Sequence, residues 1–172
     1  MPSFRSMLTV AFVAFAVPAV AAEPIHLGDF GSWSAYTATS ADGKTCYALS
    51  KPTATLPKKA VRDPITLIIS TWPGRGVVDE VQVVPGYTYR DGEPVWTQVG
   101  SYRAEFFSRN DGKAGSAWIK NLADEAQLVS AMRGGATLTV TGVSKRGTKT
   151  TDTYSLKGIT GALDRAHREC GK

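Results

Sequence analysis

The chain has 172 residues, a formal net charge of +5 and 20% charged residues, which are values typical of a globular protein. Its basic residues are spread along the chain, with acidic residues between many of them. Because there is no dense run of Lys and Arg, we expect no binding to nucleic acid. A charge of this size and spread gives only a weak attraction to anionic surfaces.

Residues 1–22 have the pattern of a secretory signal peptide. A positive charge at Arg5 precedes an almost entirely apolar run, and Pro18 then leads into small residues that suit cleavage before Glu23. The run is shorter than the roughly 20 residues of a membrane-spanning helix. We predict an exported protein whose mature chain, residues 23–172, is one domain without a transmembrane segment. The alternative is that the apolar run is retained as an N-terminal anchor.

The chain contains two cysteines, Cys46 and Cys170. An even number of cysteines in an exported protein predicts oxidation, and only one intramolecular pair is available. This disulfide would connect an early hairpin to the last turn of the chain, with a stabilisation of about 5 kcal/mol on a chain-entropy model. Two free buried thiols are the alternative. Neither cysteine belongs to a C-x-x-C motif, so a thioredoxin-like redox role is not indicated.

Short β patterns separated by turns dominate the chain after residue 22. We expect strands over residues 33–39, 44–50, 65–72, 77–84, 95–99, 102–107, 116–119, 136–141 and 150–156. Asp42-Gly43 and Asn110-Asp111-Gly112 are hairpin signals. Residues 51–63 contain two prolines and precede a third, so they are expected to form a loop. Turns every 8–12 residues or so are typical of an antiparallel sandwich or barrel.

Two helices are also predicted. Asn121 can cap the first helix, and Gly134 is expected to end it as a left-handed cap. The apolar stripe expected on this helix consists of Leu122, Ala126, Val129 and Met132. The second helix spans 159–170, and the residues expected on its apolar face are Leu163, Ala166 and Cys170. It would carry Cys170 to the sheet, close to Cys46.

The segment 144–158, SKRGTKTTDTYSLKG, is a basic turn followed by a threonine-rich strand pattern. Other characteristic residues occur in order along the chain: Gly31-Ser32-Trp33, Cys46-Tyr47, Ser50-Lys51-Pro52, Ala117-Trp118, Ala162, Leu163 and Cys170. Together they resemble the invasion-associated locus B family of exported bacterial proteins. The resemblance implies a periplasmic or surface-associated protein of Gram-negative bacteria with an immunoglobulin-like β-sandwich. Some members have a cysteine where this chain has Thr37, so any second disulfide of those members is absent here.

The resemblance brings no catalytic motif, and we predict no catalytic residue, cofactor or metal site. His26 is expected in an extended tail and His167 on the C-terminal helix, and no G-x-S-x-G motif is present to supply a nucleophile. Asp152 is expected to form a local ion pair with Arg146 and Lys149 that fixes their hairpin. The family name refers to host-cell entry, but a role in invasion does not follow from it.

Tyr87 and Tyr89 could either bind a partner or pack in the core. They share a face near two prolines. Tyrosine is enriched at protein interfaces, so the pair could form a partner-binding patch. Packing in the core is the other interpretation.

We therefore predict a non-enzymatic, exported β-sandwich in the periplasm or associated with the outer membrane or cell surface. It would bind an unknown protein or envelope component, with Lys145, Arg146 and Lys149 as the candidate contact residues. One alternative is an envelope enzyme or enzyme inhibitor with a deep pocket that holds His167 or Asp152 beside a nucleophile. Another is a purely structural envelope protein.

Overall fold

The structure is a computed structural model that describes residues 23–172. The predicted signal peptide lies outside the described residues. The strands are β1 (Ile25–Phe30), β2 (Trp33–Ser40), β3 (Gly43–Ser50), β4 (Ala54–Leu56), β5 (Thr66–Trp72), β6 (Val77–Val84), β7 (Val95–Val99), β8 (Tyr102–Asp111), β9 (Ala114–Ile119), β10 (Thr137–Val143) and β11 (Lys149–Ser155). The helical elements are η1 (Pro73–Arg75), η2 (Leu122–Asp124), α1 (Glu125–Gly134) and α2 (Ile159–Glu169).

All of these strands belong to one antiparallel sheet, in the order β1-β2-β3-β5-β6-β9-β8-β7-β10-β11-β4. Each predicted strand is present, with ends that differ by a few residues. Two edge strands were not predicted: β1, which includes His26 and pairs with β2, and β4, which lies inside the expected loop and pairs with β11. Pro52 and Pro57 flank β4, and a sheet tolerates proline at its edge because the missing N–H is not needed there.

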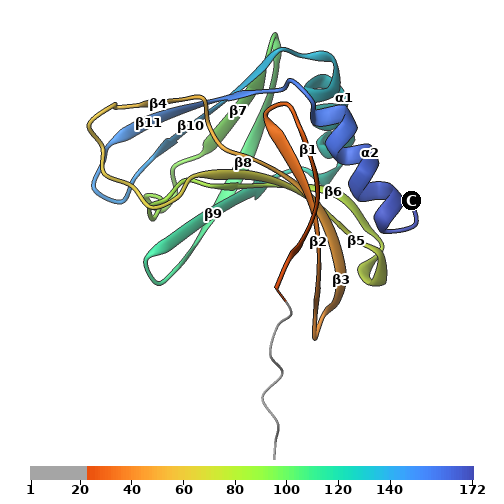
Figure 1. Ribbon diagram of the computed structural model, residues 1–172. Helices are drawn as coiled ribbons and strands as arrows, with labels where there is room; N and C mark the ends of the chain where they lie inside the picture. The colour runs from red at the N-terminus through yellow and green to blue at the C-terminus, as the bar shows by residue number, and fades with distance from the viewer. Residues whose placement is uncertain (1–22) are drawn as a thin grey trace, which may run out of the picture.

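The sheet curves so strongly that its two ends approach each other (Figure 1). Only three residues separate β3 from β4, although β4 pairs at the far end of the strand order. The indole N–H of Trp33 in β2 donates to the carbonyl oxygen of Ser155 in β11 at 3.0 Å. The N–H of Ser32 donates to the carbonyl oxygen of Lys157 at 2.9 Å. The sheet thus folds over a common core.

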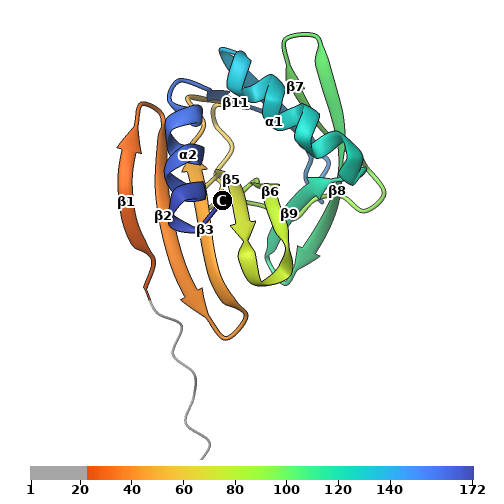
Figure 2. The same ribbon diagram turned by 90° about the vertical axis from the view of Figure 1, so that its right-hand side faces the viewer.

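The core unites both halves of the sheet and the two helices. Its buried side chains include Ile69 and Val81 from one half, Phe106 and Leu138 from the other, and Leu163 from α2. Figure 2 shows α1 and α2 at the open side between the two halves. The mainly β fold with antiparallel pairing and two helices is confirmed, and this arrangement is consistent with the predicted β-sandwich. Among residues 23–172, no helix is long and apolar enough to cross a membrane.

Helix α1 differs in detail from the prediction. Asn121 is a cap, since its side chain accepts a hydrogen bond from the N–H of Ala123 at 3.2 Å. The first turn is the 3₁₀-helix η2, whose tighter winding shifts the phase of the helix that follows. As a result, Leu122 is 76% exposed and Leu128 is buried in its place. The helix also ends without a left-handed cap, because Gly135 follows it in an extended conformation.

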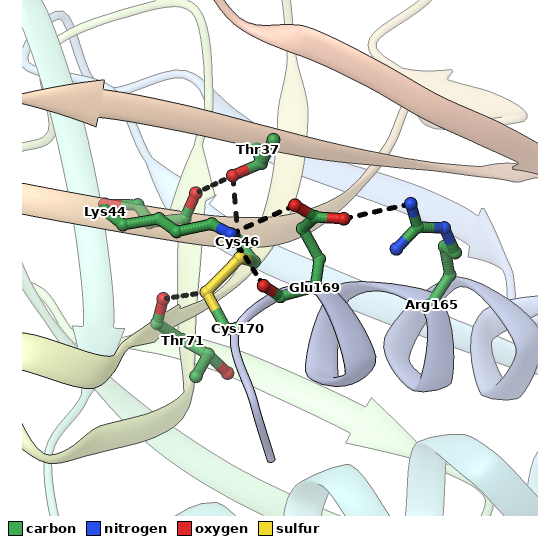
Figure 3. Close-up of polar contacts among 8 residues, drawn as sticks. Thr37, Lys44, Cys46, Thr71, Arg165, Glu169 and Cys170 are labelled. Carbon is green, nitrogen blue, oxygen red and sulfur yellow. Dashed lines mark hydrogen bonds and ion pairs between the residues drawn. A yellow bond between two sulfur atoms is a disulfide. The ribbon is translucent and has the colours of Figure 1, made fainter.

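The C-terminal end of α2 is attached to β3 by a disulfide and by one ion pair (Figure 3). Cys46 and Cys170 form the disulfide, with their Cα atoms 5.9 Å apart. The Nζ of Lys44 lies 3.0 Å from one carboxylate oxygen of Glu169, and Arg165 donates to the other at 3.0 Å. These hydrogen bonds lower the pKa of Glu169. The helix is therefore fixed to the sheet at its last turn.

Candidate functional site: a basic hollow beside the β10–β11 turn

The turn between β10 and β11 is a rigid hairpin tip that presents basic side chains. The N–H of Gly147 donates to the carbonyl oxygen of Ser144 at 2.7 Å, and the N–H of Ser144 donates to that of Thr148 at 2.9 Å. Gly147 has a φ of 88°, a left-handed conformation that favours glycine. Lys145, Arg146 and Lys149 are all exposed. The predicted hairpin is confirmed, with its cations directed to solvent.

Residues 88–90 form hydrogen bonds with this turn and with the end of β10. The N–H of Lys145 donates to the carbonyl oxygen of Thr88 at 2.8 Å, and the N–H of Arg90 donates to that of Val143 at 2.8 Å. The guanidinium of Arg90 lies against Gly147, where an added Cβ would clash with it. These contacts give the turn one position relative to the sheet.

The turn borders an open hollow of about 440 Å³, which we call the basic hollow. Its exposed cations are Lys145 and Arg146 of the turn and Lys113 of the β8–β9 turn. Asp63 is the acid among its lining residues. Lys149, the first residue of β11, is not part of the lining. The structure thus joins two of the three predicted contact residues with a lysine from another hairpin.

Arg62, which lines the basic hollow, forms a buried ion pair with Asp152. The guanidinium donates to both carboxylate oxygens, with Nη1 2.9 Å from Oδ2. Their side chains are only 6% and 2% exposed. Burial by itself lowers the pKa of Arg62, but the hydrogen bonds and negative charge of Asp152 outweigh it and raise the pKa. The pair contributes little net charge to the hollow.

This ion pair corrects the prediction for Asp152, which does not pair with Arg146 or Lys149. Successive side chains of a strand point to opposite faces. Asp152 faces inward with its neighbours Thr150 and Tyr154, whereas Lys149 faces solvent. A carboxylate in the interior requires a cation that is also buried, and the segment after β4 supplies Arg62.

Tyr87 and Tyr89 pack mainly in the interior. Tyr89 is 1% exposed, and its ring meets that of Tyr87 edge-on with centroids 5.3 Å apart. The hydroxyl of Tyr87 shares a hydrogen bond of 2.6 Å with the hydroxyl of Thr150. Burial raises the pKa of both tyrosines. Core packing is therefore the correct interpretation for Tyr89, and Tyr87 also contributes to the lining of the basic hollow.

The two histidines lie in separate places, and each has an acidic partner. His26 Nε2 lies 2.9 Å from Asp29 Oδ1 on β1, so it belongs to a strand and not to an extended tail. His167 Nε2 lies 2.6 Å from Asp79 Oδ1, where α2 meets β6. Within residues 23–172, no group of three or more His, Cys, Asp or Glu residues is arranged to hold a metal ion.

Some residues of the basic hollow were not singled out from the sequence. Lys113 and Arg62 come from segments far from the turn in sequence, and they reach it only through strand pairing and the fold of the sheet. One signal was present: Lys58-Lys59 and Arg62 surround the apolar Val61 in a proline-rich segment. The hollow can attract an anionic group, since three exposed cations face a single acid among its lining residues.

Comparison with known proteins identifies the family of this chain and a solved structure with a similar fold. The family model described as "Invasion associated locus B (IalB) protein" matches residues 33–167. The chain belongs to the invasion-associated locus B family. The crystal structure of invasion associated protein b from Bartonella henselae superposes with a TM-score of 0.62 at 17% sequence identity, covering 86% of this chain and 99% of that chain. The comparison with functionally curated proteins found no match.

At this sequence identity, the likeness to the Bartonella protein concerns the fold alone. Membership of the invasion-associated locus B family confirms the resemblance seen in the sequence, and the family is not a known enzyme family. At the position where some members have a cysteine, Thr37 donates a hydrogen bond to the carbonyl oxygen of Thr45 at 3.2 Å. The family match covers residues 33–167, and the residues that line the basic hollow all lie between Val61 and Arg146, so the match includes the whole hollow.

Proposed function

We propose that this member of the invasion-associated locus B family is an exported, non-enzymatic protein of the periplasm or cell surface. In this proposal it binds an anionic envelope component or partner through the basic hollow and the β10–β11 turn. The observation that carries the proposal is the placement of Lys145 and Arg146 on a rigid exposed turn beside Lys113. Cations held in a fixed arrangement bind an anion with a smaller entropic cost than cations on a mobile loop.

Export is supported by two independent features. Residues 1–22 have the charge, apolar run and small residues of a signal peptide. The Cys46–Cys170 disulfide is typical of proteins that fold in an oxidising compartment, such as the bacterial periplasm.

A non-enzymatic role is supported by the way the ionisable residues are used. A general base must have a free lone pair within reach of its substrate. Asp152 is held by Arg62, and His167 of α2 pairs with Asp79 of β6. Asp152 is therefore neutralised by its partner, and neither residue is part of the lining of the basic hollow. These two facts weaken the alternative of an envelope enzyme or enzyme inhibitor that uses them.

The binding proposal can be tested with the triple variant Lys145→Ala/Arg146→Ala/Lys149→Ala. We expect its binding to isolated envelope fractions to fall at least tenfold relative to wild type, because each cation near an anionic surface contributes on the order of 1 kcal/mol. The measurement is a sedimentation assay at low ionic strength. The fold should be unaffected, since all three side chains are exposed.

The matched control is Lys51→Ala/Lys157→Ala/Lys172→Ala. It removes the same number of positive charges from exposed positions outside the hollow. Equal binding by both triple variants and the wild type would refute the assignment of the turn. A purely structural envelope protein would then be the better hypothesis, and deletion of the protein should change detergent sensitivity although no ligand is found.

A further inference from the structure

Three segments that are distant in sequence meet at one end of the molecule. They are residues 56–63, from the end of β4 onward, residues 111–113 at the β8–β9 turn, and residues 144–149 at the β10–β11 turn. We call them together the tip surface. Figure 1 shows them at the left end of the sheet, while α1, α2 and the C-terminus lie toward the opposite end.

The tip surface exposes two apolar side chains. Val61 is 93% exposed and Leu56 is 52% exposed. Isolated exposed apolar residues are common on protein surfaces. Here, however, Leu56 ends β4 and Val61 lies on the loop that follows, with Lys58 and Lys59 between them and Arg62 immediately after. An apolar side chain flanked by lysines is a combination suited to the boundary between lipid headgroups and acyl chains.

Positive charge predominates on the same segments. Their exposed cations are Lys58, Lys59, Lys113, Lys145, Arg146 and Lys149. Their acidic residues are Asp63 and Asp111. The remaining cation, Arg62, is neutralised by Asp152. The tip surface therefore has a clear excess of positive charge, unlike the chain as a whole, on which charges of both signs are mixed.

The loop that presents Val61 is held in place from below. Arg62 is anchored by Asp152, the N–H of Asp63 donates to the carbonyl oxygen of Gly86 at 3.0 Å, and the N–H of Ala60 donates to that of Pro57 at 3.0 Å. With both of its neighbours fixed, Val61 projects into solvent without an ordering cost on binding.

We propose that the tip surface binds an anionic lipid bilayer. Val61 and Leu56 enter the headgroup region, and the surrounding lysines and Arg146 contact the lipid phosphates. This inference rests on the proposed function and names its partner. A soluble polyanion would use the cations but would leave the two apolar side chains in water, whereas a bilayer uses both.

The test is sedimentation of the purified protein with vesicles of phosphatidylcholine that contain one third phosphatidylglycerol, and with vesicles of phosphatidylcholine alone. We expect binding to the anionic vesicles that weakens with added salt. The Lys145→Ala/Arg146→Ala/Lys149→Ala variant should bind them roughly a hundredfold more weakly, at on the order of fivefold for each cation. Val61→Ser should lose up to about tenfold, through the lost apolar contact.

Two variants serve as matched controls. Lys51→Ala/Lys157→Ala/Lys172→Ala removes equal charge elsewhere, and Val78→Ser removes another exposed valine, on β6 beside α1. Both should bind the anionic vesicles nearly as well as wild type. Circular dichroism melts establish that every variant is folded. An equal loss for Val61→Ser and Val78→Ser, or no loss for either, overturns the proposal.

The outcomes also separate this inference from the proposed function. If the wild type binds envelope fractions through the basic turn but ignores anionic vesicles, the lipid partner is wrong and the proposed function stands. If the triple variant at the turn binds both materials as wild type does, both proposals are wrong. If a soluble polyanion displaces the protein from vesicles and Val61→Ser binds normally, the surface belongs to a soluble polyanion, which also overturns the lipid proposal.

Discussion

At the scale of single residues, the Arg62–Asp152 pair links the core to the candidate site. Arg62 lines the basic hollow, and its pairing with Asp152 joins the loop after β4 to the inner face of β11. A buried pair of this kind costs desolvation energy and need not stabilise the fold overall. It does determine a position, however, because neither charge can be left alone in the interior. The pair therefore decides where Val61 is displayed.

Replacement of Arg62 by Leu should destabilise the protein by about 3–5 kcal/mol, because the carboxylate of Asp152 would be left buried without a partner. Urea denaturation measures this change in the free energy of unfolding. The control is Lys120→Ala, which breaks the exposed 2.8 Å pair with Glu105 and should cost less than about 1 kcal/mol. A similar loss in both variants would contradict the role assigned to the buried pair.

At the scale of elements, helix α2 attaches the C-terminal part of the chain to the N-terminal strands β1, β2 and β3. Its buried face packs against the sheet, and its last turn is held by the disulfide and by Glu169 with Lys44 and Arg165. The disulfide is covalent, so it does not respond to mild acid. The contacts of Glu169 do respond, because they require an ionised carboxylate.

The pKa of Glu169 lies below its ordinary value of 4.5 in the folded protein. A lowered pKa means that this carboxylate stabilises the fold above the unfolded-state pKa and that the stabilisation is lost as the pH falls through the folded-state pKa. The wild type should therefore lose stability relative to Glu169→Gln on acidification below about pH 4.5. Urea denaturation at a series of pH values measures this, and added salt should reduce the difference because the pair is exposed. Parallel pH profiles for both proteins would contradict it.

At the scale of the whole molecule, the decisive feature is the approach of the two ends of the sheet. Trp33 stands at this junction, with its indole N–H bonded to Ser155 and its ring buried in the common core. The three-residue connection between β3 and β4 also keeps the two ends of the sheet close together, because β4 pairs at the far end of the strand order. This closure brings residues 56–63 against the β10–β11 turn and so creates the tip surface.

Trp33→Ala should destabilise the protein by about 3–5 kcal/mol, through the cavity it leaves and the unpaired carbonyl oxygen of Ser155. Trp96→Ala is the control, because Trp96 is only partly buried and stacks under the guanidinium of Arg103, 3.8 Å from its ring centroid. It should cost clearly less. Thermal unfolding of both variants provides the comparison, and an equal decrease in melting temperature would argue against a special role for Trp33.

The local elements could largely be predicted from the sequence, because their causes are local. Alternation of apolar residues marks strands such as β6, and Asn121 marks the start of the helix. The phase of α1 could not be read in this way, since a single 3₁₀ turn rotated Leu122 out of the core. The short strand β4 has no pattern of its own and exists only because β11 offers it an edge.

By itself, the sequence determined the β-rich class, the hairpin at residues 144–149 and the family, and it left Cys170 as the one possible disulfide partner of Cys46. These depend on neighbouring residues, on a motif, or on there being one possible pair. Only the tertiary structure decided that Asp152 joins Arg62 and that Lys113 stands beside Lys145. The physical reason is that a side chain on a strand finds its partner through the pairing and curvature of the whole sheet, which no single segment encodes.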